Sequence, residues 1–122
     1  MKIQESGEMY LEAILVLKKE MPQVRAIDVA GHTGYSKPSV SRALGILKSG
    51  GYITVDDAGF ISFTPMGLEH AERIFERHNV LSEFFKKIGV PEDVAVEDAC
   101  KIEHVISEDT FKALKLYAGI KN

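Results

Sequence analysis

Several features that define whole classes of protein are scarce or missing in this chain of 122 residues. A single cysteine excludes an internal disulfide framework and is typical of a reducing compartment. No apolar run is long enough to cross a bilayer, and the first ten residues lack the pattern of a signal peptide. We therefore expect a cytoplasmic globular protein without a membrane partner.

Internal repeats, low-complexity linkers and the paired Cys and His motifs of zinc fingers are also missing from the sequence. An enzyme that uses Cys100 as a nucleophile and His104 as a base is one hypothesis. No glycine elbow stands nearby to stabilise an oxyanion, and one helical turn is a poor frame for attack on a substrate. We therefore predict that the chain is not an enzyme.

The net charge of −3 does not by itself indicate a nucleic-acid partner, but the charges are unevenly distributed. Residues 18–48 carry six Lys or Arg against two acids, whereas residues 92–109 carry seven acids against one Lys. This asymmetry favours anion contact by the first half and cation binding or assembly by the second. Ordinary mixed surfaces show similar fluctuations, so the charge alone leaves both interpretations open.

Helical periodicity and end signals predict a mainly α protein. Before residue 51, helices are expected around residues 6–21, 26–33 and 36–49. Ser6 and Ser36 are the expected N-caps of the first and third helices, and Ile27, Val29 and Ala30 the buried part of the second. Two short alternating runs around "DDAG" then predict a hairpin. This order is typical of a winged helix-turn-helix, which we place at residues 1–64, followed by a helical domain at residues 65–122.

The third helix begins with short polar side chains, which suits entry into the major groove of DNA. Val40, Leu44 and Leu47 form its apolar stripe and are expected inside. A winged helix that contacts only proteins is the alternative, but Lys and Arg on the leading face favour DNA. Two acids in the wing argue against phosphate binding by the wing tip. The candidate DNA contacts are Ser36, Lys37, Pro38, Ser39, Ser41 and Arg42.

Three predicted helices offer side chains that bind metals. On a helix, Cys100, Glu103 and His104 would share one face. Thioether, thiolate, imidazole and carboxylate donors together suit a borderline divalent transition metal better than calcium or magnesium. Alternatively, Cys100 is a small core residue beside two ordinary surface residues. The candidate ligands are Met9, Glu12, His78, Cys100, Glu103 and His104.

Four stretches carry a resemblance to a known family: "EMYLEAI", "SKPSVSRAL", "RHNVLSEFFKKIGV" and "EDACKIEHVIS". Over nearly its whole length the chain resembles the metal-dependent repressors related to the diphtheria toxin repressor and the manganese transport regulator. The resemblance implies Met9, Cys100, Glu103 and His104 as metal ligands. Manganese-type members carry an acid at the positions of Met9 and Cys100, so we expect an iron-type site.

A second metal site is less complete. At two positions of the iron-type ancillary site this chain has Ser82 and Val96, which are poor ligands. Glu12 and His78 match ligands of the manganese-type members, which implies a second metal held by both residues and a shared Glu103. The alternative is a core histidine satisfied by Glu12.

The resemblance implies a homodimeric, metal-activated regulator of a double-stranded DNA operator, in the short form without an SH3-like domain. The helical domain would then serve dimerisation and metal binding. We expect repression of metal-uptake genes with Fe(II) as the metal, while Mn(II), Co(II), Ni(II) and Zn(II) stay open. The alternatives are a manganese-responsive regulator of the same family and a winged-helix regulator that uses Cys100 as a redox sensor. The predicted dimer seam contains Phe84, Phe85, Val105, Ile106, Phe111 and Leu114.

Overall fold

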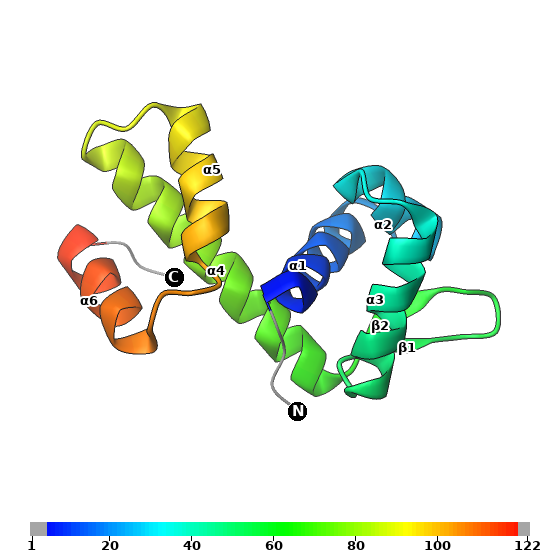
Figure 1. Cartoon of the computed structure of the whole chain (residues 1–122). Helices are drawn as coiled ribbons and strands as arrows, with labels where there is room; N and C mark the ends of the chain where they lie inside the picture. The colour runs from blue at the N-terminus through cyan, green and yellow to red at the C-terminus, as the bar shows by residue number, and fades with distance from the viewer. Residues whose placement is uncertain (1–4, 120–122) are drawn as a thin grey trace. The chain divides into compact units, whose positions relative to one another are not determined.

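A computed structural model describes residues 5–119 of the chain (Figure 1). Within this range it contains six helices and one two-stranded sheet, which confirms the predicted mainly α fold. The chain divides into two compact units, Met1–Glu72 and Arg73–Asn122. None of the described helices has the length and apolar character needed to span a membrane.

The first unit has the element order of a winged helix-turn-helix. Its helices α1, α2 and α3 are followed by the antiparallel strands β1 and β2 and by the first turns of α4. Ser6 lies inside α1 and is not the N-cap that the sequence suggested. The elements are α1 (Glu5–Glu20), α2 (Ala26–Thr33), α3 (Lys37–Ser49), β1 (Ile53–Val55), β2 (Ile61–Phe63) and α4 (Pro65–Lys87).

The turn between α2 and α3 is set by two local signals. Gly34 ends α2 in the left-handed region, with a φ of 79°, where a side chain would be strained. Ser36 then caps α3, because its hydroxyl oxygen accepts a hydrogen bond from the Ser39 backbone N–H at 3.3 Å. The exposed first turn of α3 follows directly from this cap.

The core of the first unit is built from aliphatic side chains of every element. Leu11 and Ile14 of α1, Val29 of α2 and Val40 of α3 are fully buried. Ile27 was expected beside Val29 in this core, but the structure leaves it 59% exposed. Its position two residues before Val29 places it on another side of α2.

The hairpin is fixed by burial of its apolar side chains and by hydrogen bonds to the preceding part of the chain. Its register pairs Ile53 with Phe63, and both Ile53 and Ile61 are buried. The backbone N–H of Ile61 also donates to the carbonyl of Val24 at 2.8 Å, and the Lys18 ammonium donates to the Ile61 carbonyl at 2.9 Å. The wing is therefore fixed to the last turn of α1 and to the segment between α1 and α2.

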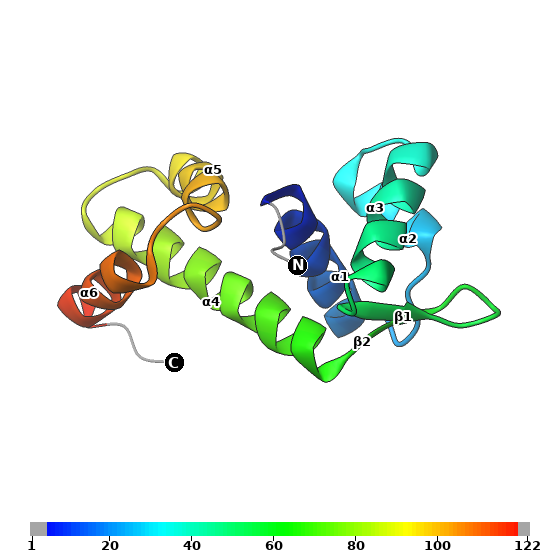
Figure 2. The same ribbon diagram turned by 60° about the horizontal axis from the view of Figure 1, so that its bottom comes forward.

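The second unit contains most of α4 together with α5 (Glu92–Ile102) and α6 (Glu108–Ala118). Small buried residues of α5, Ala95 and Ala99, allow close packing of its inner face. Phe111 of α6 is 3% exposed, so it is a core residue and is not available for the dimer seam predicted from the sequence. Figure 2 shows α6 beside the C-terminal half of α4. Lys115 of α6 pairs with Glu76 of α4 at 2.8 Å.

Candidate metal centre

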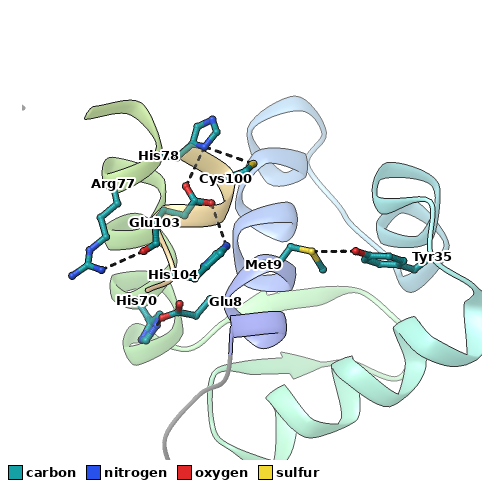
Figure 3. Close-up of polar contacts among 9 residues, drawn as sticks. All are labelled: Glu8, Met9, Tyr35, His70, Arg77, His78, Cys100, Glu103 and His104. Carbon is teal, nitrogen blue, oxygen red and sulfur yellow. Dashed lines mark hydrogen bonds and ion pairs between the residues drawn. The ribbon is translucent and has the colours of Figure 1, made fainter. Parts of the chain in front are cut away.

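Three candidate ligands of the second unit converge between α4 and α5 (Figure 3). His78 Nδ1 lies 3.0 Å from Glu103 Oε2 and 3.9 Å from Cys100 Sγ. Suitable donor atoms of the three residues all lie within 4.8 Å of one another. A soft, a basic and an anionic donor thus face one small volume.

Glu103 is the centre of this cluster, and its side chain is fully buried. Its second oxygen, Oε1, lies 3.3 Å from His104 Nε2, so the carboxylate stands between two imidazoles. Burying a carboxylate is costly unless cationic or hydrogen-bonding partners compensate for the lost water. A divalent cation supplies such compensation.

The end of α5 determines which ligands meet. The helix stops at Ile102, and Glu103 is its C-cap, with its N–H donating to the Ala99 carbonyl at 2.9 Å. His104 therefore follows the helix instead of continuing it, contrary to the expected single helical face. Cys100 Sγ lies near His78, whose Nδ1 contacts one carboxylate oxygen of Glu103, while His104 contacts the other oxygen. We expected His78 in a different set from Cys100.

Arg77 holds this turn, and the sequence reasoning missed it. Its guanidinium donates to the Glu103 carbonyl at 3.2 Å and to the Ile106 carbonyl at 2.8 Å. It also lies over the Phe111 ring, 5.4 Å from the centroid, and 3.7 Å from a Glu108 oxygen. No local sequence signal marked these contacts, because Arg77 lies 26 and 29 residues before the two carbonyls that it binds.

The residues present fit a first-row transition metal. Zinc-like ions lie about 2.0–2.3 Å from Cys, His and carboxylate donors, so ligand atoms around one ion are at most about 4.6 Å apart. The spread of 4.8 Å in the His78, Cys100 and Glu103 set needs only small side-chain rotations to match. The mixed S, N and O donors favour iron, cobalt, nickel or zinc over calcium and magnesium.

Met9 and Glu12 lie on α1 in the first unit, and their part in the centre stays a prediction. The Met9 sulfur already accepts a hydrogen bond from the Tyr35 hydroxyl, at 3.6 Å (Figure 3). Within the same unit Glu8 Oε2 pairs with His70 Nε2 at 2.6 Å, which the sequence did not predict. Glu8 and Met9 thus have partners inside their own unit.

The candidate DNA contacts form the leading end of α3. Val40, Leu44 and Leu47 are buried, as predicted. The Ser36 hydroxyl donates to Ser39 Oγ at 3.0 Å, and Ser39 is half-buried. The other candidates are exposed, and these are Lys37, Pro38, Ser41 and Arg42.

A winged helix-turn-helix joined to a helical unit with a cluster of metal-binding side chains defines a class: regulators whose DNA binding depends on a metal. Two family descriptions match the chain. "Iron dependent repressor, N-terminal DNA binding domain" matches residues 2–59, and "Iron dependent repressor, metal binding and dimerisation domain" matches residues 64–119.

Curated relatives agree with these matches. The transcriptional regulator MntR of Escherichia coli is 32% identical over 108 residues, covering 88% of this chain and 70% of the relative. An uncharacterized HTH-type transcriptional regulator of Methanocaldococcus jannaschii is 29% identical over 115 residues, covering 93% of this chain and 92% of that relative. The chain belongs to the DtxR/MntR family of metal-dependent transcriptional repressors.

Solved structures show the same fold. The metal-dependent transcriptional regulator MtsR superposes with a TM-score of 0.87 at 22% identity, over 94% of this chain and 54% of that chain. A manganese-dependent transcriptional repressor in complex with manganese gives 0.86 at 21% identity, over 94% and 53%. The chain thus spans about half the length of these two solved chains. The relatives are regulators, which confirms the predicted family and the expectation of a regulator instead of an enzyme.

Proposed function

We propose that this chain is a metal-activated repressor that binds a double-stranded DNA operator as a homodimer. Residues 1–64 would bind DNA through the leading end of α3, and residues 65–122 would provide dimerisation and metal binding. The observation that carries the proposal is the fully buried Glu103 carboxylate between two imidazoles, with the Cys100 thiol 3.9 Å from one of them.

Each ligand has a specific task in this proposal. A bound metal supplies a compact positive charge that compensates the buried carboxylate. His78 and Cys100 present their donor atoms to one carboxylate oxygen of Glu103, and His104 stands at the other oxygen. Arg77 keeps the Glu103 backbone in place through its hydrogen bond to the carbonyl. A second metal that shares Glu103 would use His104.

Met9 and Glu12 would add ligands from the first unit. The metal would then join both units and select one orientation of the DNA-binding unit. The two α3 helices of a dimer must enter major grooves about one turn apart, roughly 34 Å. Metal would favour DNA binding by selecting this spacing, and DNA would tighten metal binding by the same factor.

The dimer would form through apolar surface of the second unit. Its well-exposed apolar side chains include Ile88, Val105 and Leu116, which are 62%, 68% and 84% exposed. Phe84 and Phe85 are half-buried. We propose that these side chains keep the protein dimeric with and without metal, since none of them is a candidate ligand.

Mn(II) is the first candidate for the activating metal. Two fold neighbours are named as a manganese regulator and a manganese-dependent repressor, and the Escherichia coli relative is called MntR. These relatives do not support the expected Fe(II) specificity. Fe(II) stays the second candidate because of one observation, the Cys100 thiol beside His78, since thiolate donors favour softer metals. The regulated genes would be those of metal uptake, and the site of action the cytoplasm.

A metal-titrated operator-binding assay tests the proposal. Operator affinity would be measured against free Mn(II) and, without oxygen, against free Fe(II), using the parent, Cys100→Ala and the double variant Met9→Asp/Cys100→Glu. We expect Cys100→Ala to weaken activation by every metal and the double variant to raise the Mn(II) response relative to Fe(II). Operator binding that ignores metal and chelator contradicts the proposal, and binding that follows oxidation of Cys100 indicates a redox sensor instead.

A further inference from the structure

Tyr35 of the first unit lies close to residues proposed to bind DNA and to a residue proposed to bind metal. It lies in the turn between α2 and α3, directly before the N-cap residue Ser36. Tyr35 is 48% exposed and directly precedes the candidate DNA contacts, which begin at Ser36. A tyrosine at the start of a recognition helix is well placed to donate to a DNA phosphate.

The same hydroxyl is bound to a candidate metal ligand. Tyr35 donates to the Met9 sulfur at 3.6 Å, across 26 residues of sequence (Figure 3). The ring of Tyr35 packs at a tilt against Tyr10, with 6.0 Å between centroids. Burial raises the pKa of Tyr10, and the nearby Tyr35 hydroxyl raises it further, which agrees with this close packing.

The contact of the Tyr35 hydroxyl with the Met9 sulfur competes with a contact to a DNA phosphate. A tyrosine hydroxyl has one hydrogen, so a full hydrogen bond to the Met9 sulfur excludes one to a phosphate oxygen. A thioether is a weak acceptor, and a metal ion would draw on the same sulfur lone pairs. In the metal-free protein the Tyr35 hydroxyl therefore has a hydrogen bond to the Met9 sulfur, and metal binding to that sulfur would weaken the bond.

We propose that Tyr35 is a positioning residue that couples the two sites: its hydroxyl is held by the Met9 sulfur without metal and is released to a DNA phosphate when Met9 binds metal. This inference rests on the proposed function, since it needs Met9 as a ligand. It adds a connection inside the first unit, through the turn that begins the recognition helix.

Tyr35→Phe tests the coupling because it keeps the ring and removes only the hydroxyl. Without DNA, the variant has no hydrogen bond to break, so its metal affinity should rise about twofold to fivefold. With saturating metal, its operator affinity should fall about threefold to tenfold, because one phosphate contact is lost. A purely structural role for Tyr35 would lower both affinities.

A double-mutant cycle in chelator gives a readout that needs neither metal nor DNA. Thermal unfolding would be compared for the parent, Tyr35→Phe, Met9→Leu and the double variant. We expect Tyr35→Phe to lower the unfolding midpoint of the parent but not that of Met9→Leu. Tyr117→Phe, which removes the hydroxyl of an 86% exposed residue in the second unit, is the control and should leave all three measurements unchanged.

The outcomes separate this inference from the proposed function. If the parent protein binds the operator equally well with and without metal, the proposed function is wrong. A parent that responds to metal, with a Tyr35→Phe variant of equal metal and operator affinities and no coupling to Met9, overturns the role of Tyr35 alone. Opposite shifts of the two affinities, together with coupling in the cycle, support it.

Discussion

The leading end of α3 and the Glu103 cluster differ in how far their polar side chains are exposed to solvent. On α3, Lys37, Ser41 and Arg42 extend into solvent, and the local hydrogen bonds serve to start the helix. In the second unit, a carboxylate is fully buried between two imidazoles and beside a thiol. The side chains at the start of α3 stay hydrated until a partner binds, whereas the Glu103 carboxylate is already removed from water beside an exposed Cys100.

This difference indicates how strongly each region depends on its partner. Exposed cationic side chains remain hydrated without DNA, so the absence of phosphate costs the folded protein little free energy. Their contacts with phosphate are also screened by salt. A buried carboxylate is costly without compensating charge. We therefore expect changes at the cluster to have larger effects than changes at the DNA surface.

Glu103→Gln should have the largest effect. The amide keeps the shape of the side chain but removes the negative charge that attracts the ion, so metal affinity should fall by at least about 100-fold. Calorimetric metal titration without DNA measures it. Glu97→Gln is the matched control, because Glu97 is on the same helix, is exposed and pairs only weakly with Lys101 at 3.5 Å. Equal metal affinity in both variants would break the contrast between the regions.

Arg77→Lys should be the most damaging conservative change to stability. An ammonium cannot reproduce the planar fork that reaches the carbonyls of Glu103 and Ile106. We expect a loss of about 2–3 kcal/mol in the free energy of unfolding, measured with urea. Arg73→Lys, at an exposed site on the same helix, should change it far less. A loss below about 0.5 kcal/mol for Arg77→Lys would show that another group holds the turn.

Arg42→Ala should weaken operator binding about tenfold and reduce the salt dependence by about one counterion. The side chain is exposed, so the free energy of unfolding and the metal affinity without DNA should not change. Lys48→Ala, at the opposite end of α3, is the control. An Arg42→Ala variant that binds operator like the parent would mean that α3 does not present this face to DNA.

The smallest predicted effects compare identical caps in the two units. Ser36 accepts a hydrogen bond from the Ser39 N–H at 3.3 Å, and Ser107 accepts one from the Thr110 N–H at 3.1 Å. Each change to Ala should cost about 1 kcal/mol of stability. Only Ser36→Ala should also lower operator affinity at saturating metal. Equal losses of operator affinity would indicate that both caps act through folding alone.

Local signals made much of the fold predictable. Gly34 and Ser36 marked the turn before α3, and the alternating apolar residues around "DDAG" marked the hairpin. Ile27 was misplaced because its side of α2 depends on packing against neighbouring elements.

The site was predictable in its residue types but not in its grouping. The spacing proposed Cys100, Glu103 and His104 as one set on a helical face, but α5 ends at Ile102 and the structure groups Cys100 and Glu103 with His78. Arg77 and the contact between Tyr35 and Met9 were missed because each joins residues far apart in the sequence. Periodicity does not encode such tertiary contacts.

Cobalt(II) absorption spectroscopy tests the central claim, a metal bound by the Cys100, His78 and Glu103 cluster, most directly. A thiolate bound to cobalt gives a charge-transfer band that nitrogen and oxygen ligands do not give. We predict this band in the parent, its loss in Cys100→Ala with some cobalt still bound, and little cobalt binding in Glu103→Gln. Identical cobalt spectra for the parent and Cys100→Ala would show that the thiol is not a ligand and would contradict the account.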